Sequence, residues 1–343
     1  MNGLYIYGIM READLARVDP NLLFPGKGIG VVVKDNFGAV VAPTQEETFK
    51  ATQEGLLGHF EVLSKLMNVG PVFPIRFGTV AGTQEDARHL LGSLLMLIDP
   101  VLDHLNGKAE FDVEARWNPQ VAYPKIAEAD PEIKALKERI AGQGTPPSME
   151  DRLAVGKLVA EAVANQGEVY RRQIKEALRE AALESAPLPV GRDKDLFMNR
   201  AFFVEQTQTE AFEKKLYSLG ESFQDAVHFK YAGPLPPYSF TGCEIAAVTP
   251  AMLEEARQTL ELGEKFTREE FTHQARKLSL ARHPDRNAGD PTATERFKQL
   301  LTAVALLDRF FAQCGEEFVK SNLPDMVFLV AKEFGRKEHL EWV

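Results

Sequence analysis

Few side chains in this sequence have the spacing that catalysis or metal binding requires. The seven histidines are scattered, and none forms the i, i+4 pair with a third ligand nearby that is typical of zinc sites. The glycine-rich segment at residues 25–30, PGKGIG, matches neither the dinucleotide-binding nor the P-loop spacing, and no G-x-S-x-G motif occurs. Since no pair of Asp or Glu residues stands out as acid and base, we expect no catalytic residue, no metal site and no cofactor.

One loop-forming segment does raise a chemical question. The stretch ARHPDRNAGD, residues 281–290, contains a proline, an aspartate, an asparagine and a glycine in quick succession, as a turn between two helices does. A capping or turn role would explain Asp285. It would not explain His283 and Pro284 directly before it, so the loop is a candidate for recruiting a partner.

The composition is that of a globular protein long enough, at 343 residues, for two or three domains. The formal charge of −10 argues against a nucleic-acid partner. Cys243 and Cys314 are too few and too far apart for a disulfide framework, so we expect idle or buried thiols in a reducing cytosol. The N-terminus lacks the pattern of a signal peptide, and the apolar run at residues 90–98 is shorter than the roughly 20 residues of a membrane span. We expect a cytoplasmic protein without a membrane partner.

The first 118 residues mix strand and helix patterns without a strict βαβ rhythm, which favours an α+β fold over a doubly wound sheet. Short apolar runs rich in β-formers predict strands at residues 4–10, 71–80 and 109–117, the last at an edge or half-exposed, and a hairpin at 30–43. Helical periodicity predicts helices at residues 46–67 and 83–105, with Thr83 as the N-cap of the second.

The middle of the chain predicts a second α+β region. Three prolines interrupt the charged stretch at residues 119–147, which indicates a short helical insert, and a long helical pattern follows at 148–185. Gly156 and Gly167 weaken that helix, so we expect a kink or a break. A strand, a helix and a strand then occupy residues 199–240, which fits a ferredoxin-like sandwich.

The C-terminal part is predominantly helical, with one more apolar run, MVFLVA, near the end of the chain. We expect the tail to pack across the helical module, with a partner-binding tail as the alternative. The expected organisation is two α+β domains linked by long helices, plus an all-helical C-terminal module. The expected boundaries are 1–118 for the first domain, 119–190 for the helical linker, 191–247 for the ferredoxin-like domain and 248–343 for the module and tail.

Two further segments have unusual patterns. In GPLPPYSF the prolines fix φ and remove backbone donors, so the segment is a stiff, extended exit from a strand, anchored by its aromatic residues. It is either a rigid loop packed on its own domain or a binding groove. In PVFPIRFGTV, Arg76 lies among apolar neighbours in an expected strand; it either faces outward or is internally paired, or it contacts a partner.

These segments together resemble the gas vesicle GvpL/GvpF family. GPLPPYSF resembles its GPWPPY-F signature, NRAFFVE its N-AFLV strand, and PVFPIRFGTV and LYIYGI two elements of its first half, all in the family's order. Leu235 and Phe203 depart from the usual tryptophan and leucine. The resemblance covers residues 1 to about 245 and implies an accessory protein of gas vesicle assembly. The family-motif residues that it nominates for partner binding are Arg76, Phe77, Gly78, Pro234, Pro236, Pro237 and Tyr238.

Residues 268–308 resemble a J-domain from its second helix to its third, with residues 256–262 in place of the first helix. J-domains use the His-Pro-Asp loop and a basic helix to dock onto a heat-shock ATPase chaperone. The resemblance therefore implies a docking loop and basic contacts, namely His283, Pro284, Asp285, Arg276, Lys277 and Arg282. Ala275 replaces the usual tyrosine and Ala281 a usual basic residue, so the alternative is a J-like fold kept for packing or shell contacts.

The resulting functional hypothesis is a non-enzymatic accessory protein of gas vesicle assembly. It would bind the shell protein GvpA and other accessory proteins, to nucleate the shell or to keep its subunits from aggregating, and would recruit a heat-shock ATPase chaperone. A subunit that packs edge to edge exposes apolar surface and strand edges beforehand, which a soluble acidic partner would cover. The alternatives are a minor structural shell component with an inert J-like module, and a general co-chaperone unrelated to vesicles.

Overall fold

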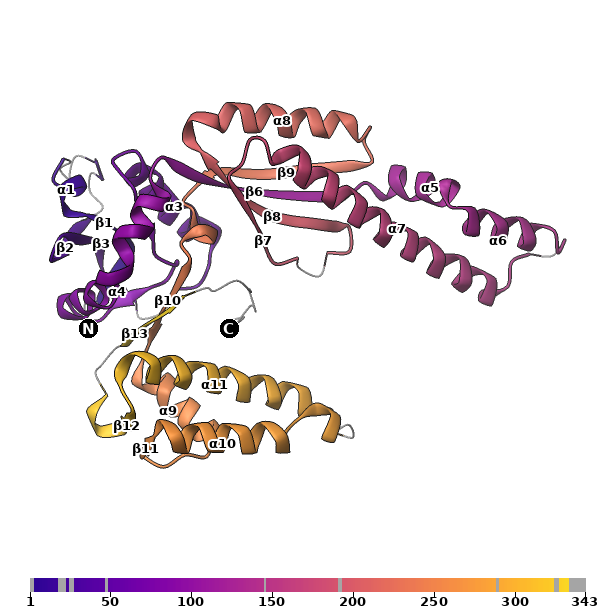
Figure 1. Ribbon diagram of the computed structural model, residues 1–343. Helices are drawn as coiled ribbons and strands as arrows, with labels where there is room; N and C mark the ends of the chain where they lie inside the picture. Colours follow the sequence, from indigo (N-terminus) through magenta and orange to yellow (C-terminus); the bar gives the residue numbers. More distant parts are fainter. Residues whose placement is uncertain are drawn as a thin grey trace. The chain divides into compact units, whose positions relative to one another are not determined.

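The chain divides into two units, each of which contains an antiparallel sheet. One unit is Met1–Asn106 together with Thr241–Val343, and the other is Gly107–Phe240. The computed structural model describes residues 3–17, 23–24, 28–46, 49–144, 146–190, 193–287, 290–323 and 327–332. Figure 1 shows the mixture of sheets and helices, with a helical C-terminal region, and so confirms the expected α+β class.

The sheet of the first unit has the strand order β2-β3-β1-β4, and β5 also pairs with β1. The hairpin expected from the sequence is confirmed, with a tight turn in which Asp35 has a φ of 53°. The strands and helices of this part are β1 (Gly3–Arg11), α1 (Glu12–Leu15), β2 (Gly30–Lys34), β3 (Phe37–Thr44), α3 (Gln53–Met67), β4 (Phe73–Pro74), β5 (Val80–Ala81) and α4 (Gln84–Leu105).

Helices α3 and α4 face opposite sides of this sheet. The apolar stripe of α4 packs with Ile6, Ala39 and Val41 in a core that excludes water, while α3 places its buried His59 against Tyr5, the neighbour of Ile6 in β1. Successive side chains of a strand point to opposite faces, so both faces of the sheet are covered. Thr83 caps α4 as expected, in a reciprocal capping box with Asp86.

Two expectations for the first unit are wrong. The expected strand at residues 71–80 is instead the two short strands β4 and β5, separated by a turn at residues 76–79 in which Gly78 has a φ of 85°. The expected helix at 46–67 begins only at Gln53, after the N-cap Thr52, because the Thr52 side chain accepts the backbone N–H of Gly55.

The sheet of the second unit has the order β7-β8-β6-β9, all antiparallel. This is the ferredoxin-like arrangement expected from the sequence. The first unit has the same arrangement, because its sheet order β2-β3-β1-β4 corresponds strand by strand to β7-β8-β6-β9. Its elements are β6 (Lys108–Trp117), α5 (Pro119–Ala129), α6 (Pro131–Ala141), α7 (Met149–Leu178), β7 (Glu184–Pro187), β8 (Leu196–Glu205), α8 (Thr209–Ser222) and β9 (Val227–Leu235).

Strand β6 is a central strand of this sheet, because β8 and β9 pair with it on either side. Of the two expected alternatives, an edge strand or a half-exposed strand, the edge position is therefore wrong. The expected domain boundary at 118 therefore differs from the observed one, which precedes β6. Phe111 packs on Phe212 of α8 and Trp117 on Tyr170 of α7. Since both residues have odd numbers on one strand, α7 and α8 cover the same face, and the other face carries the even-numbered residues.

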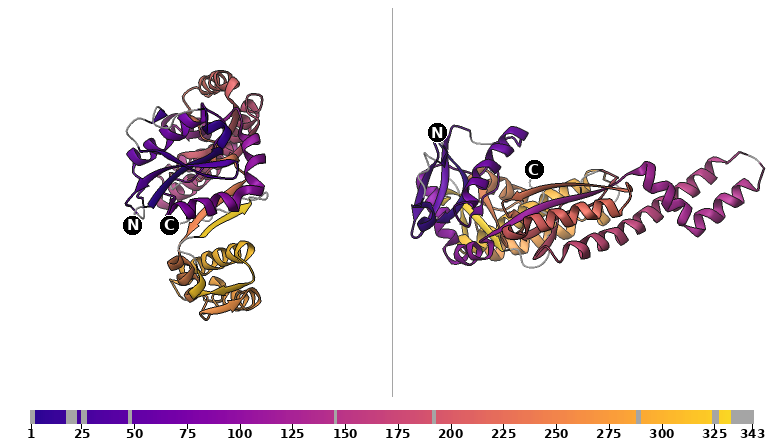
Figure 2. Two further views of the ribbon diagram at one scale, coloured as in Figure 1. Left: turned by 90° about the vertical axis from the view of Figure 1, so that its left-hand side faces the viewer. Right: turned by 90° about the horizontal axis from the view of Figure 1, so that it is seen from above.

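Helices α5, α6 and α7 form a long helical hairpin, in which α7 returns along α5 and α6 (Figure 2). The expected kink or break is absent from α7, which continues for 30 residues from a capping box between Ser148 and Asp151. Gly167 is buried in α7, and a β-carbon there would lie 3.7 Å from Trp117 and from Phe197. At that distance a β-carbon would make ordinary van der Waals contacts, so an alanine would also fit between this helix and the sheet.

The C-terminal helical module lies between the two strands of an antiparallel pair, β10 (Cys243–Val248) and β13 (Val327–Lys332). Ile245 and Phe328 belong to the core of the first sheet, while Val248 and Val327 belong to the core of the helical module. Two short paired strands add to the helices that the sequence predicts. The elements of the module are α9 (Pro250–Thr259), β11 (Lys265–Thr267), α10 (Arg268–Ala281), α11 (Ala293–Cys314) and β12 (Glu317–Val319).

Some expectations fall outside the described residues, namely the packing of the tail beyond residue 332, residues 25–27 of the glycine-rich segment and the side chain of Cys243. Cys314 is a free, exposed thiol. In the part of the chain that the structure describes, no helix has both the length and the apolarity needed to cross a bilayer. Over the same residues, no three His, Cys, Asp or Glu side chains are grouped as metal ligands.

Candidate functional site

The His-Pro-Asp loop joins α10 to α11, two antiparallel helices whose apolar stripes meet. Phe271 and Leu278 of α10 are buried with Leu300 and Leu307 of α11 in one cluster, as their helical spacing predicts. Helix α10 starts at a capping box between Thr267 and Glu270. The loop itself contains one turn of 3-10 helix at Pro284–Arg286, where proline occupies the first position because its missing N–H is not needed there.

The two polar side chains of the triplet are exposed. The side chain of His283 is 47% exposed and that of Asp285 is 88% exposed. The backbone N–H of Asp285 donates to His283 Nδ1 over 3.3 Å, so in the neutral ring the proton sits on Nε2. The ring of His283 meets that of Phe297 edge to face, with centroids 5.1 Å apart. The histidine is thus oriented from within the module, whereas the aspartate carboxylate faces solvent.

Asn287 fixes the path of the backbone through the loop. Its Nδ2 donates to the carbonyl oxygens of Ala281 and His283, each over 3.0 Å, and its backbone N–H donates to Pro284 O over 2.9 Å. The carbonyl of Ala281 is one of the last in α10 and has no partner within the helix. Asn287 therefore joins the end of α10 to both ends of the His-Pro turn. The sequence pattern placed Phe297 in the apolar stripe of the helix after the loop and Asn287 in the motif itself, but it assigned neither residue a role in orienting the loop.

The three basic residues nominated for docking fall into two groups. Arg276 and Lys277 are exposed on α10, and neither forms an ion pair with a residue in the described part of the chain. Arg282 instead pairs with Glu261 and donates to Thr259 O over 3.3 Å. The structure thus brings His283, Pro284, Asp285, Arg276 and Lys277 together as accessible groups, and ties Arg282 to the end of α9.

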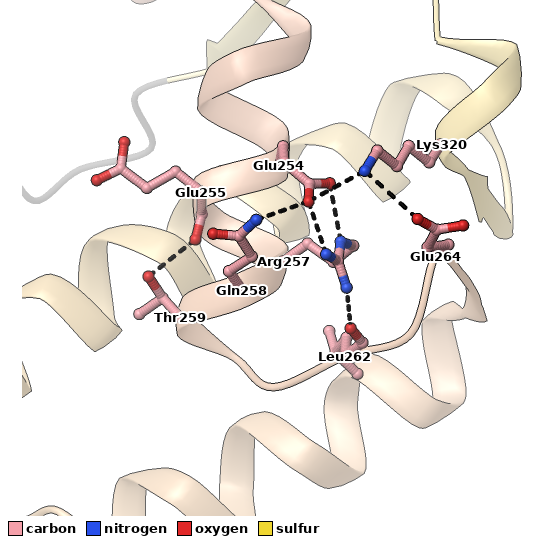
Figure 3. A network of polar contacts seen from close by, with 8 residues as sticks. All are labelled: Glu254, Glu255, Arg257, Gln258, Thr259, Leu262, Glu264 and Lys320. Atoms are coloured by element: carbon pink, nitrogen blue, oxygen red, sulfur yellow. Dashed lines mark hydrogen bonds and ion pairs between the residues drawn. The ribbon is translucent and has the colours of Figure 1, made fainter.

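A polar network connects α9 to the segments that follow it in the module (Figure 3). Glu254 accepts hydrogen bonds from Arg257 at 2.6 and 2.9 Å, from Gln258 at 2.8 Å and from Lys320 at 3.3 Å. The hydrogen bond from Arg257 is the main cause that lowers the pKa of Glu254 to about 2. Lys320 also reaches Glu264 at 3.4 Å, so the network connects α9, the loop before β11 and the turn after β12.

A groove runs between α10 and α11 on the outside of the module. Its volume is about 600 Å³, and apolar side chains form most of its lining. Leu280 is 62% exposed and Leu301 is 46% exposed at its walls, while the small Ala275 lies in its floor. Ala275 stands at the position where J-domains usually have a tyrosine, so the groove is open at this point.

The family motif around Arg76 forms a type II turn in the first unit. The backbone N–H of Thr79 donates to Arg76 O over 3.2 Å, and Gly78, with a φ of 85°, occupies the turn position that requires glycine. Arg76 is exposed, and it does not lie in a strand. Phe77 packs among Tyr5, Phe49 and His59, with ring centroids 5.7 to 6.1 Å apart.

A chain of hydrogen bonds holds this turn on the sheet. Gly78 N–H donates to the Tyr5 hydroxyl over 3.3 Å, and that hydroxyl lies 2.7 Å from His59 Nδ1. His59 Nε2 lies 3.1 Å from Ile75 O, which has no hydrogen to give, so Nε2 carries the proton and Tyr5 donates to Nδ1. Burial lowers the pKa of His59 to about 4, so the ring is neutral near pH 7. Burial also raises the pKa of Tyr5.

The proline-rich motif is the exit segment of the second unit, residues 236–240. Pro234 lies at the end of β9, an edge strand, where its missing N–H removes no bond of the sheet interior. Pro236 and Pro237 are buried, and Tyr238 begins a 3-10 turn in which Phe240 stacks on Phe203 with centroids 4.6 Å apart. The geometry favours a rigid segment packed on its own unit over an open groove.

Glu110 anchors the exit segment, and sequence reasoning missed it. Its carboxyl accepts the Ser239 backbone N–H at 2.7 Å and contacts the Ser239 hydroxyl at 2.8 Å. The alternating pattern of β6 indicated a solvent-facing charge, but the side chain is only 3% exposed. Only the return of the chain over this face, 129 residues later, covers it. The motif residues of the exit segment and those of the Arg76 turn belong to different units.

Comparison with known proteins gives two matches along the chain. The family model of the gas vesicle synthesis protein GvpL/GvpF matches residues 3–242, and that of the DnaJ domain matches residues 258–309. Gas vesicle protein F of a Streptomyces species is 28% identical over 247 residues, which are 69% of this chain and 98% of that protein. Human DnaJ homolog subfamily C member 5B is 33% identical over 82 residues, which are 24% of this chain and 39% of that protein.

A solved structure has the same fold over the first match. The crystal structure of gas vesicle protein GvpF from Microcystis aeruginosa superimposes with a TM-score of 0.56 at 24% sequence identity. The superposition covers 70% of this chain and 98% of that one. The strands β10 and β13 and the helical module between them follow the GvpL/GvpF match in the sequence.

Proposed function

Because the chain belongs to the gas vesicle GvpL/GvpF family and carries a DnaJ domain after it, we propose that it is a non-enzymatic accessory protein of gas vesicle assembly. It binds the gas vesicle shell protein GvpA, either to nucleate the shell or to keep its subunits from aggregating. It also recruits a heat-shock ATPase chaperone through the His-Pro-Asp loop. The relatives that match the first part of the chain are named gas vesicle proteins, and none of their names describes an enzyme.

The observation that carries this proposal is how the helical module is attached. It is an insertion between β10 and β13, and Ile245 and Phe328 on those strands pack in the core of the first sheet. A module held at both ends by strands of one core stays with the GvpL/GvpF part of the chain. It would bring a chaperone to whatever that part binds, within one molecule.

The accessible groups of the loop support the recruiting role. His283 and Asp285 are exposed, Asn287 fixes the backbone between them and α10, and Arg276 and Lys277 lie on the helix that precedes them. A partner with an acidic surface could meet all of these groups from one side of the module, because they lie on α10 and on the turn that follows it. No bond has to be broken inside the module for this contact.

The first experiment measures stimulation of a cognate heat-shock ATPase by the purified full-length chain. We expect the wild type to stimulate hydrolysis and His283→Gln to abolish the stimulation, as the loss of a docking contact worth a few kcal/mol would. His273→Gln is the matched control, since His273 is an exposed histidine of α10 outside the loop. If His283→Gln retains both the stimulation and vesicle formation in cells, the recruiting role is wrong.

The second experiment removes the module without disturbing the strands that carry it. Val248 and Val327 are the last pair of the β10–β13 ladder, so an Asn-Gly turn between them would replace residues 249–326. We expect this variant to fold and to capture GvpA in a pull-down, because the family motifs lie before residue 243. Failure of both this variant and the wild type to capture GvpA would contradict the shell-binding role.

One observation favours the structural alternative, a minor shell component with an inert J-like module. Arg282, one of the three basic residues expected to dock, is engaged by Glu261 and Thr259 within the module. This alternative predicts no ATPase stimulation and normal vesicles from His283→Gln. The remaining alternative, a co-chaperone unrelated to vesicles, conflicts with the family match.

A further inference from the structure

The exit segment, residues 236–240, is the last part of the second unit before the chain enters the first unit at Thr241. Its polar contacts with β6 include the pair between Ser239 and Glu110, at 2.7 and 2.8 Å. Phe240 adds a stacked contact with Phe203, with the ring planes inclined by 16°. A buried carboxyl group, together with this ring contact, therefore helps to hold the conformation of the segment.

Glu110 has a second carboxyl beside it. Asp112 is two residues further along β6 and lies on the same face, so two carboxyl groups are neighbours there. The strand residues directly opposite Glu110 are the apolar Phe203 and Leu235. The charged and titratable groups on this face of the described part of the neighbouring elements include Lys108, Asp112, Glu114 and Arg116 on β6, Glu184 on β7, Glu205 on β8, His228 and Lys230 on β9 and Tyr238 on the exit segment.

The cations on this face have other contacts. Lys108 Nζ lies 5.8 Å from the centre of the Phe203 ring, and Lys230 stands opposite Glu114 in the ladder. Burial, together with the negative charge of Asp112, raises the pKa of Glu110 to about 8, although the contacts from Ser239 oppose the rise. Two neighbouring carboxylates in a buried site repel each other, which favours a state in which one of them keeps a proton.

We propose that Glu110 and Asp112 form a pH-sensitive latch, which holds Ser239 and Phe240 against β6 while the two carboxyl groups share one proton. When the proton leaves to solvent, two carboxylates lie side by side in a site with little access to water. Their repulsion and the cost of burying both charges favour an open arrangement, in which Glu110 is solvated by water and its two contacts with Ser239 are broken. No covalent bond changes, and the event is reversible.

The direction of the pH dependence follows from the folded-state pKa, which lies above that of a free glutamate. The closed latch binds a proton that the open one does not, so the stability that this proton provides is full below about pH 4.5, the ordinary value for a glutamate, and is lost as the pH rises to about 8. The response therefore extends to mildly alkaline pH, where an ordinary glutamate is fully ionised and has no response.

The test is hydrogen exchange of the full-length chain, read by mass spectrometry on peptides that cover residues 236–242 and corrected for the intrinsic effect of pH. Between pH 7 and pH 9 we expect the protection of this segment to fall by about tenfold, since the ratio of open to closed latch rises about tenfold for each pH unit below the pKa of about 8 and levels off above it. Glu110→Gln keeps the shape of the side chain and cannot ionise. We expect it to keep the segment protected throughout this range.

Two further variants make the outcome specific. Asp112→Asn removes the neighbouring charge, so the midpoint of the change should move to lower pH. Glu114→Gln, on the same strand and face, should leave it in place, because Arg116 pairs with Glu114 at 3.0 Å outside the latch. Wild-type protection that does not change with pH overturns the proposal. If the pH midpoint of the change in protection is the same in Asp112→Asn as in the wild type, the proposal is also overturned, and this result does not require that Glu110→Gln folds.

Discussion

The hydroxyl of Tyr5 lies 2.7 Å from His59 Nδ1 and accepts the backbone N–H of Gly78 over 3.3 Å. One hydroxyl group thereby joins the first strand, helix α3 and the turn that contains Arg76. The histidine completes the link through its contact with Ile75 O at 3.1 Å. The conformation of the turn that contains Arg76 is therefore fixed by the side chains of Tyr5 and His59, which lie far from it in the sequence.

Because His59 is buried in its neutral form, the first unit should lose stability at acidic pH. The unfolded chain binds a proton at this residue near pH 6.5, whereas the folded chain does so only near pH 4. The free energy of unfolding should therefore fall by up to about 3 kcal/mol as the pH drops through this window. His59→Phe should lose about 1–3 kcal/mol at pH 7 and lack this part of the pH dependence. Urea denaturation at pH 7, 5.5 and 4 would measure both, and parallel curves for the two proteins would contradict the prediction.

Replacement of glycine by alanine should have opposite effects on stability at Gly78 and at Gly58. Gly78 has a φ of 85°, so Gly78→Ala strains the backbone and should cost about 1–2 kcal/mol. Gly58 lies inside α3, and a β-carbon added there would meet no neighbouring side chain within 4 Å, so Gly58→Ala should stabilise the protein by roughly 0.5–1 kcal/mol. Thermal unfolding of the two variants side by side tests this, and equal shifts would contradict the assigned turn.

Asn287 predicts a loss of partner stimulation without a loss of fold. Asn287→Ala removes both contacts of Nδ2, which hold the loop to the end of α10. With an exposed loop no longer fixed, we expect stimulation of the heat-shock ATPase to fall by about tenfold or more, while the free energy of unfolding changes by about 1 kcal/mol or less. The measurement is a titration of the variant into the ATPase assay, with circular dichroism as the folding control. Full stimulation by Asn287→Ala would show that the loop does not need this clamp.

The capping box of α10 predicts a difference between two threonines of the same region. Thr267 accepts the backbone N–H of Glu270 at the start of the helix, so Thr267→Ala should cost about 1 kcal/mol. Thr272 is one turn into the helix, and its hydroxyl donates to Arg268 O, a bond that the helix does not need. Thr272→Ala should be neutral or slightly stabilising. Chemical denaturation followed by circular dichroism compares them, and a larger loss from Thr272→Ala would contradict this assignment.

The local patterns of the sequence predicted most of the elements. Alternation and turn residues indicated the β2–β3 hairpin, apolar stripes indicated α4, α10 and α11, and Thr83 indicated the start of α4, since all these depend on neighbours within a few residues. The family-like segments and the His-Pro-Asp loop were found in the same way. The sequence pattern was wrong at residues 71–80, where a turn at residues 76–79, stabilised by Gly78 and the Tyr5 hydroxyl, divides the expected strand into two short ones.

The amino-acid sequence by itself determined the α+β class, the ferredoxin-like arrangement of the second unit and the presence of a J-like module after a GvpL/GvpF-like part. Only the tertiary structure decided that β6 is central, that the module is inserted between β10 and β13, and that Glu110 is buried. Strand order and burial depend on which distant segments pair. A charged residue in an alternating strand looks the same in the sequence whether water or a returning segment covers it.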